Sequence, residues 1–386
     1  YDDKMSNFIP LSVPNITGSE QKYVNEALST QWVSTGGEFI NRFEKEIAEY
    51  LNVPMAVSCQ SGTAGLHLSM VVSDVGYGDE VIVPTLTFIA AINPVKYVGA
   101  EPVFMDCDES LCMDMKKLEE FCREECNFDG KTLSNKKTNR PIKAVVVVHV
   151  FGNMADIESA VEICNKYNLV LIEDATEALG TYFTEGKYKG KFAGTIGDIG
   201  VYSFNGNKVI TTGGGGMLVA KDIEKAKRVK YLSTQAKDDQ INFFHGAVGY
   251  NYRMTNIQAA MGVAQLERLE EFIETKRVNY LRYKEEINND KMCILDFTEG
   301  IRPNYWFYAL LMKNCEKDST IKYFSDNDVQ TRPIWGLIHE QKPYMSNQSY
   351  KIEKAKYYFD RVVNIPCSSN LSLEDVKRII GLLKLL

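Results

Sequence analysis

The stretch from residue 143 to residue 174 contains two nearly continuous apolar runs, KAVVVVHV (143–150) and LVLIED (169–174), on either side of the helical pattern ADIESAVEICNKY (155–167). Apolar runs without polar alternation are typical of strands that are covered on both faces of a sheet. A strand, a helix and a second strand in this order predict a parallel βαβ unit. Further strand candidates lie at 55–59, 80–84, 102–106, 198–204 and 216–220. The sequence therefore predicts an α/β domain with a mostly parallel, seven-stranded sheet.

The pattern changes at about residue 255. From the possible cap Thr255, one long helical period runs through TNIQAAMGVAQLERLEEFIETKRVNYLRYKEEI. The residues that follow mix short strand and helix candidates, which is typical of a smaller α+β domain. We predict a large domain over 5–254, and a long connecting helix with a small C-terminal domain over 255–386. Residues 1–4 precede Met5, where we expect the natural start, and are left out.

Composition and charge exclude several classes of protein. The 386 residues include 44 Lys and Arg against 51 Asp and Glu, and this net charge of −7 argues against a nucleic-acid-binding protein, which normally has a basic face. No apolar run reaches the roughly 18 residues of a membrane span. The N-terminus also lacks the apolar core of a signal peptide. We therefore expect a cytoplasmic protein without membrane contacts.

The nine cysteines indicate a reduced interior. They are odd in number, scattered over the chain and often part of apolar stretches. A disulfide framework is typical of short secreted chains, so reduced core thiols are the better interpretation. Cys122 and Cys126 lie one helical turn apart, but no second pair and no nearby His completes a zinc site. We predict no metal.

Common nucleotide and hydrolase motifs are missing. No G-x-G-x-x-G follows a strand, and the chain lacks G-x-x-x-x-G-K-[ST], G-x-S-x-G and H-E-x-x-H. The sequence therefore lacks the usual signatures of four activities: hydride transfer on a Rossmann fingerprint, P-loop hydrolysis, serine esterase chemistry and zincin chemistry.

Three groups at predicted strand ends match the needs of pyridoxal phosphate (PLP). The segment SCQSGTAGLH (58–67) is a strand end, a turn and a helix start, whose free N–H groups can bind a phosphate. Asp174 ends a buried strand, where a carboxylate needs a cationic partner such as a protonated pyridine nitrogen. Lys208 lies in SFNGNKVITTGGGG (203–216), after a strand end and before four glycines. PLP enzymes need a phosphate site, a ring-nitrogen carboxylate and a lysine.

These motifs resemble the DegT-type sugar aminotransferases. SGTAGLH, PTLTFIA, IEDATEALG, GDIGVYSFNGNKVITTGGGGML and GYNYRMTNIQAA occur in the order of that family, and the resemblance covers nearly the whole chain. It implies a PLP enzyme of fold type I, similar to aspartate aminotransferase, that acts on a nucleotide-linked ketosugar. Within the family, the NGNK and EDATEALG forms most resemble the enzymes that make UDP-N-acetylbacillosamine or legionaminic-acid precursors.

The resemblance also implies roles for single residues. Lys208 would bond covalently to the cofactor, and Asp174 would pair with the pyridine nitrogen and keep it protonated. Gly62 and Thr63, together with the hydroxyl of Ser203, would hold the phosphate.

Other matching positions have an alternative interpretation. Phe88 would stack on the cofactor ring, or is a core aromatic. Asn251, in GYNYRM, resembles a residue that reaches the phosphate of the neighbouring subunit, which implies a homodimer with shared active sites; the alternative is a turn residue. Arg332 and His339 resemble positions near the sugar nucleotide, or are solvated charged residues. His149, which ends VVVVHV, either lines the cofactor pocket or belongs to the core.

The chain departs from the family pattern at two places. Many relatives carry Gln or His near the phenolic oxygen of the cofactor, but this chain has Glu177, and a carboxylate would repel that oxygen unless one of the two holds a proton. Glu177 therefore either has a raised pKa or points elsewhere. TTGGGG replaces the T-G-E-G-G of many relatives, which should leave the chemistry unchanged because backbone geometry is the requirement there.

The predicted reaction is a ping-pong transamination. Glutamate gives its amino group to the cofactor, and the 4-keto group of a nucleotide-linked 4-keto-6-deoxy sugar, in a 2-acetamido form, then receives it. One alternative is a PLP-dependent nucleotide-sugar dehydratase, but relatives with that activity carry His in place of the lysine. The other is a non-catalytic PLP-binding sensor, which would not need every group of the cofactor site. The choice among UDP, GDP and dTDP stays open.

Overall fold

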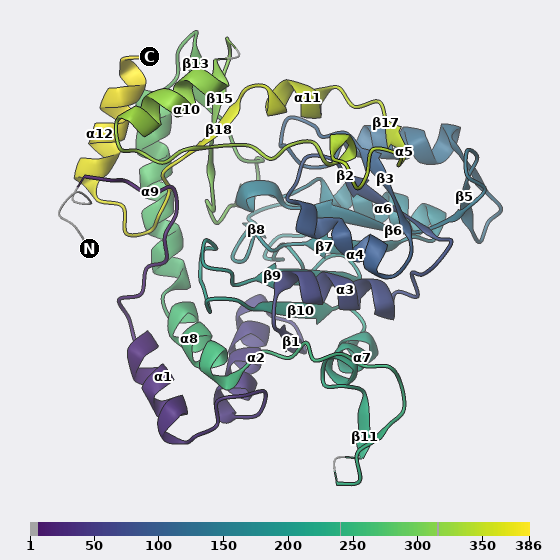
Figure 1. The fold of residues 1–386 in the computed structure, drawn as a ribbon. Coiled ribbons are helices and arrows are strands. Elements are labelled where there is room, and N and C mark those ends of the chain that lie inside the picture. The colour runs from purple at the N-terminus through teal and green to yellow at the C-terminus, as the bar shows by residue number, and fades with distance from the viewer. Residues whose placement is uncertain (1–6, 240, 315) are drawn as a thin grey trace.

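A large, mostly parallel sheet forms the centre of the molecule (Figure 1). The computed structural model describes residues 7–239, 241–314 and 316–386. In spatial order the main strands are β1 (Ala56–Cys59), β10 (Gly216–Ala220), β9 (Ile199–Ser203), β7 (Val170–Asp174), β6 (Pro141–Val148), β2 (Glu80–Pro84), β3 (Glu101–Met105) and β17 (Ser349–Tyr350). Neighbouring strands are parallel, except that β10 is antiparallel to both β1 and β9. All seven predicted strands are present, and the predicted fold class is confirmed.

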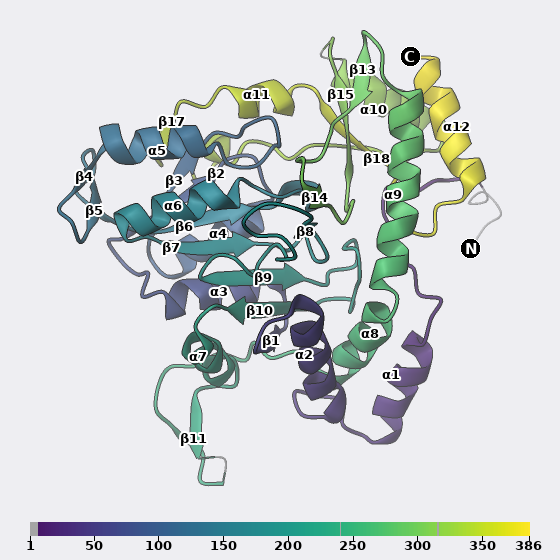
Figure 2. The ribbon, with the colours of Figure 1, turned by 180° about the vertical axis from the view of Figure 1, so that it is seen from behind.

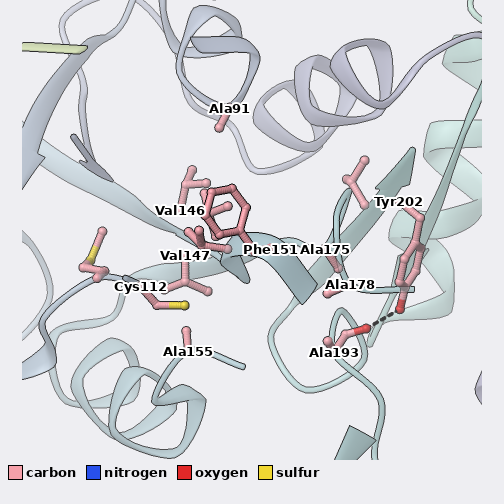
Figure 3. Close-up of a cluster of buried hydrophobic side chains, with 14 of the residues drawn as sticks. Ala91, Cys112, Val146, Val147, Phe151, Ala155, Ala175, Ala178, Ala193 and Tyr202 are labelled. Atoms are coloured by element: carbon pink, nitrogen blue, oxygen red, sulfur yellow. Dashed lines mark hydrogen bonds between the residues drawn. The ribbon is translucent and has the colours of Figure 1, made fainter. Parts of the chain in front are cut away.

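Helices cover both faces of this sheet. Helices α3 (Gly62–Val72) and α4 (Asn93–Tyr97) lie on the face toward the viewer in Figure 1, and α5 (Met115–Glu124) and α6 (Ile157–Tyr167) lie on the opposite face, toward the viewer in Figure 2. Strand β6 is accordingly buried at five consecutive positions, 144–148. Figure 3 shows part of this core, in which the Tyr202 hydroxyl donates to the carbonyl oxygen of Ala193 at 2.6 Å.

Two additions extend the sheet beyond the predicted strands. The polar segment 126–141 forms a hairpin of β4 (Cys126–Phe128) and β5 (Leu133–Asn135), and β5 pairs with β6. The other addition is β17, which comes from the C-terminal part of the chain and pairs with β3. The domain boundary at 254/255 stays a prediction, but β17 shows that the chain returns to the large sheet after it.

The predicted long helix after residue 255 is two helices. Helix α8 (Asn256–Leu266) begins with the capping box of Thr255 and Gln258, and α9 (Leu269–Glu286) follows after a break. At the break, Arg268 leaves helical geometry, with φ −114° and ψ 5°, and its guanidinium donates to the Thr17 hydroxyl at 2.6 Å. The prediction of one continuous helix is therefore wrong, because contacts with the N-terminal segment compete with the helical pattern at this point.

The C-terminal part has its own small antiparallel sheet. It is ordered β13 (Met292–Ile294), β15 (Tyr308–Met312), β18 (Val362–Ile365) and β16 (Arg332–Pro333). Helix α10 (Lys317–Asp326) packs on this sheet, and α12 (Leu373–Lys384) packs on α9 (Figure 2). The remaining elements are α1 (Glu20–Ser29), α2 (Glu38–Leu51), α7 (Ile223–Ser233), α11 (Lys354–Phe359), the hairpin β11 (Lys237–Asp239) and β12 (Phe244–His245), the pair β8 (Tyr182–Phe183) and β14 (Ile301–Arg302), and the 3₁₀ turns η2 (Ile89–Ala91), η3 (Val150–Gly152) and η4 (Ile338–Glu340).

The described residues contain neither a membrane-spanning helix nor a cluster of metal ligands. None of their helices combines the length and the apolar character that a membrane crossing requires. Within the same ranges, no group of three or more His, Cys, Asp or Glu side chains is placed to hold a metal ion.

A buried carboxylate joins the large sheet to the C-terminal segment. Asp106, just after β3, accepts hydrogen bonds from the Lys117 ammonium (2.6 Å) and from the backbone N–H groups of residues 353–355 (2.7–3.0 Å), where α11 begins. Burial alone would raise the pKa of Asp106, but the lysine and the N–H groups hold that pKa below its usual value. The ionised carboxylate therefore stabilises the folded state.

We expect Asp106→Ala to lower the free energy of unfolding at neutral pH by about 3 kcal/mol, because it removes these bonds and leaves Lys117 largely buried. The pKa of Asp106 is depressed in the folded state, so its contribution is present above the unfolded pKa and is lost as the pH falls through the folded value. Urea unfolding at pH 7 and at acidic pH measures both effects. Glu353→Gln, which removes the exposed partner of Lys117, is the control and should cost less than about 1 kcal/mol. Equal losses in both variants would contradict the assignment.

Candidate active site

A cavity of about 430 Å³ lies beyond the carboxyl ends of the central strands. Its lining comes from the start of α3, the loop after β2, the turn after β7 and the loop between β9 and β10. The C-terminal part adds the aromatic side chains of Trp306, Phe307 and Trp335. Segments that are far apart in the sequence thus meet around one space, which is the usual place for a ligand in an open α/β sheet.

The N-terminus of α3 forms one end of the cavity. Ser61 caps the helix by accepting a hydrogen bond from the N–H of Ala64 at 3.0 Å, and Gly62 and Thr63 line the cavity beside it. A Cβ atom on Gly62 would lie 3.0 Å from the Cβ of Ser203, so a larger residue would push the two segments apart by a few tenths of an ångström. Free N–H groups and nearby hydroxyls at a helix N-terminus are suited to bind a phosphate.

Asp174 places a carboxylate in the cavity at the end of β7. The side chain is buried, and its Oδ1 accepts a hydrogen bond from the N–H of Thr176 at 3.0 Å. Burial raises the pKa of Asp174, whereas its contacts with Thr176 and the positive charge of Lys208 act in the opposite direction. A further cation at this point would favour the ionised carboxylate.

Lys208 supplies the amine of the cavity. It lies in the loop between β9 and β10, with its Nζ 4.0 Å from the centre of the Trp306 ring. Burial lowers the pKa of Lys208, and the neighbouring carboxylates of Glu177 and Asp174 partly offset this effect. An amine with a lowered pKa is unprotonated at lower pH than an exposed lysine, which makes it a better nucleophile.

Glu177 adds a second carboxyl group to the same cavity. Its side chain is buried, and Oε2 accepts a hydrogen bond from the N–H of Phe151 at 2.7 Å. Burial raises the pKa of Glu177 to about 7; the charge of Lys208 lowers it and that of Asp174 raises it further.

The donor to Glu177 belongs to an unusual turn. Phe151 has a left-handed backbone, with φ 58°, and Gly152 follows with φ 87°. The carbonyl oxygen of Gly152 accepts a hydrogen bond from the Thr181 hydroxyl at 2.7 Å. Buried Asn304 donates to the carbonyl oxygen of Glu177 at 2.8 Å, and its own Oδ1 accepts from the N–H of Trp306 at 2.9 Å. Asn304 thereby fixes both the Glu177 turn and the aromatic wall.

The structure brings most of the predicted site residues together. Seven of them line the cavity: Gly62, Thr63, Phe88, Asp174, Glu177, Ser203 and Lys208. The alternative of a core aromatic is wrong for Phe88, because 56% of its surface is exposed.

The other three candidates lie outside the cavity lining. Asn251 is exposed at the base of the β11–β12 hairpin, where it bridges to Thr234, and Arg332 is exposed on β16. His339 is turned toward Thr85, with 2.6 Å between its Nδ1 and the threonine hydroxyl.

His149 belongs to the core and not to the cavity lining. Its Nδ1 accepts a hydrogen bond from the N–H of Ala155 at 3.0 Å, so Nε2 carries the proton and donates to Glu173 at 2.8 Å. Glu173 also accepts from the N–H groups of Gly194, Ile196 and Gly197. This network satisfies both buried side chains without a ligand.

Sequence analysis missed the aromatic wall and the residues that support it. Trp306 and Phe307 stack with ring centres 3.9 Å apart, and the Trp306 indole donates to the carbonyl oxygen of Asn207 at 2.7 Å. Trp335 packs on Phe151, with ring centres 4.9 Å apart. The only signal in the sequence was the aromatic run NYWFY at 304–308, which reads equally well as part of a core strand.

The cavity fits PLP. Asp174 offers a buried carboxylate that would pair with a protonated ring nitrogen, and Lys208 offers the amine. The N-terminus of α3 suits the phosphate, and the exposed face of Phe88 offers an apolar surface for a flat ring.

Comparisons with known proteins support the same assignment. The DegT/DnrJ/EryC1/StrS aminotransferase family matches residues 14–384. The chain is 38% identical to GDP-perosamine synthase of Escherichia coli O157:H7, with 96% of each chain covered. It is 34% identical to EpsN of Bacillus subtilis strain 168, described as a pyridoxal phosphate-dependent aminotransferase, over 98% of this chain and 96% of the relative. Among solved structures, the aminotransferase TlmJ of Streptoalloteichus hindustanus has a TM-score of 0.88 at 29% identity, with 98% of each chain covered.

We expect borohydride reduction of the PLP-treated protein at neutral pH to label Lys208, because its amine faces the cavity and has a lowered pKa. Peptide mass spectrometry locates the label. Lys276 is the matched control: burial lowers its pKa too, but its amine donates to the carbonyl oxygen of Cys367 away from the cavity. Label on Lys276, or equal label on Lys208 and on surface lysines, would contradict this account.

Proposed function

The chain belongs to the DegT/DnrJ/EryC1/StrS aminotransferase family and is a PLP-dependent aminotransferase; we propose that it transfers an amino group from glutamate to the 4-keto group of a nucleotide-linked 4-keto-6-deoxy sugar. The observation that carries this proposal is the meeting of Lys208, Asp174 and the α3 N-terminus in one cavity. A dehydratase of this fold would carry His in place of Lys208.

The proposed roles follow from the positions of the cavity residues. Bound PLP supplies an electron sink that stabilises negative charge on the substrate carbon. Asp174 keeps the ring nitrogen protonated, because an ion pair favours both charged forms in a buried site. Gly62, Thr63 and Ser203 hold the phosphate, and Phe88 packs on the ring face.

Lys208 acts as nucleophile and as proton carrier. Its lowered pKa makes an unprotonated amine available at a lower pH than for an exposed lysine. With PLP and an amino donor bound, the free Nζ would take a proton from the donor carbon that bears the nitrogen and would pass that proton to the cofactor. The same amine runs these steps in reverse when the ketosugar enters, so one residue serves both halves of the ping-pong reaction.

Binding of anionic substrates requires cations beyond the cavity lining. Among the residues that the structure describes, Lys208 is the only cationic side chain that lines the cavity, whereas a sugar nucleotide and glutamate both carry negative charge. Arg332 is exposed on β16, three residues before the cavity residue Trp335. We assign Arg332 to the diphosphate or to the donor carboxylate, with His339 on the same segment.

We also propose a cytoplasmic homodimer with shared active sites. Asn251 lies outside the cavity of its own chain, so a role at a phosphate requires a second subunit. The neighbouring β11–β12 hairpin carries exposed apolar side chains, namely Ile241, Phe243, Phe244 and Val248, which a partner would cover. The described cysteines form no disulfides, in agreement with a reducing compartment.

A panel of ketosugars tests the substrate. We expect protein loaded with pyridoxamine phosphate to regain the visible absorbance of PLP when it is mixed with one of the UDP-, GDP- or dTDP-linked 4-keto-6-deoxy sugars, with or without a 2-acetamido group. The 38% identity to GDP-perosamine synthase supports the GDP sugar, and the NGNK and EDATEALG forms support the UDP-linked 2-acetamido sugar. Lys208→Ala is the control; it should bind the cofactor but give no turnover. If the wild-type protein regained no PLP absorbance with any of these sugars, the proposed substrate class would be contradicted. Turnover at the wild-type rate in Lys208→Ala would contradict the mechanism.

Heterodimers test the shared site. We expect Lys208→Ala and Asn251→Ala each to lose most activity as homodimers. A heterodimer of the two, isolated by two different tags, should recover about half of the wild-type activity, because one of its two sites combines an intact Lys208 with an intact Asn251. A heterodimer as inactive as its parents would show that Asn251 serves its own chain.

A further inference from the structure

The two oxygens of Glu177 have different surroundings. Oε2 accepts the hydrogen bond from the N–H of Phe151, at 2.7 Å, and the left-handed turn at Phe151 fixes this donor. The carboxyl group nevertheless belongs to the cavity lining, and only 4% of the residue surface is exposed. One oxygen is thus held by the backbone, which leaves the other available to a ligand.

The groups that face Glu177 do not neutralise it fully. Lys208 approaches from the loop between β9 and β10, and Asp174 lies on the same turn as Glu177. The third titratable neighbour is the buried thiol of Cys112, from the segment before α5, and burial keeps this thiol neutral. The single amine of Lys208 therefore faces two carboxyl groups, and it carries no positive charge while it waits to act as a base, because a base must be unprotonated before it takes a proton.

The connectivity of the PLP ring indicates which atom Glu177 meets. The phenolic oxygen lies on the ring carbon next to the one that carries the aldehyde, on the side opposite the phosphate arm. With the ring nitrogen at Asp174, the aldehyde at Lys208 and the phosphate at Gly62 and Thr63, the phenolic oxygen is directed away from α3. Glu177 lines the cavity without belonging to the phosphate end, and its turn packs on η3 through Phe151.

We propose that Glu177 holds a proton and donates a hydrogen bond from its free carboxyl oxygen to the phenolic oxygen of bound PLP. This inference rests on the proposed function of the cavity. Two like charges at hydrogen-bond distance in a buried site cannot both persist, so one proton must be shared between carboxyl and phenolic oxygen. Burial raises the pKa of Glu177 to about 7, so a large share of the carboxyl groups already holds a proton at neutral pH before the cofactor enters. A protonated Glu177 then donates a hydrogen bond to the phenolic oxygen without adding a negative charge.

The affinity of the protein for PLP across pH tests this role. Dissociation constants would be measured from the cofactor absorbance between pH 5.5 and 9 for the wild-type protein and for Glu177→Gln, which keeps a donor that does not titrate. Because binding requires the protonated carboxyl, the ratio of the wild-type constant to the Gln constant should be close to one at low pH. It should rise by about tenfold per pH unit above the pKa of Glu177. A ratio that stays constant over this range would overturn the proposal.

A second variant keeps the test decisive if Glu177→Gln does not fold. Glu177→Met has a similar size but neither charge nor donor, so it should bind PLP about tenfold more weakly than the wild-type protein at pH 6. If Glu177 were an ionised, repelling carboxylate, the Met variant would bind as tightly as the wild-type protein or more tightly.

A matched control separates this effect from general burial. Glu80→Gln changes another buried glutamate, which accepts hydrogen bonds from Asn135 and Thr138 and does not line the cavity. It should show the wild-type constant at every pH. Failure of the wild-type protein to bind PLP at all would overturn the proposed function together with this inference, whereas normal binding with a constant Gln ratio would overturn the inference alone.

Discussion

One ammonium group and two carboxylates share a buried cavity, and the active site depends on this charge pattern. Burial penalises each charge separately, which lowers the pKa of Lys208 and raises those of Asp174 and Glu177. His149 and Glu173, on the neighbouring strand ends, have their hydrogen bonds filled by each other and by backbone N–H groups. Within the part of the chain that the structure describes, the three cavity groups have no comparable set of protein partners. Buried polar groups normally have hydrogen-bond partners in the protein. The incomplete set around Lys208, Asp174 and Glu177 therefore indicates a ligand site.

The fold holds this pattern in place from several directions. Parallel strands bring their carboxyl ends to one edge, so Asp174 at the end of β7 and Lys208 after β9 meet although they are 34 positions apart in the sequence. The C-terminal part completes the cavity with an aromatic wall, and Asn304 links that wall to the Glu177 turn through two hydrogen bonds. Asp106 and β17 in turn tie the C-terminal segment to the large sheet. The segments next to the small sheet, which carry Trp306, Phe307 and Trp335, therefore supply one side of the active site.

Local patterns explain what could be predicted from the sequence. The apolar runs define the seven central strands, and the polar residues at their ends define the phosphate site, Asp174 and Lys208. The aromatic wall could not be predicted, because the sequence around Trp306 and Trp335 contains no signal for their position. Long-range packing places both side chains in the cavity at the large sheet. The break between α8 and α9 involves a contact of Arg268 with Thr17, some 250 residues earlier in the sequence. The local helical pattern therefore could not predict this break. Glu177 was ambiguous for a similar reason: its orientation is set by the backbone of Phe151, and a left-handed turn in FGN is not visible in composition.

The most direct test of this account is a crystal structure of the wild-type protein grown with PLP at neutral pH. The account predicts continuous density from Lys208 to the cofactor, the ring nitrogen within hydrogen-bonding distance of Asp174, the phosphate at the N-terminus of α3 and the phenolic oxygen facing Glu177. Cofactor bound elsewhere, or a ring turned so that its nitrogen faces away from Asp174, would contradict the central claim that these buried charges exist to hold this cofactor.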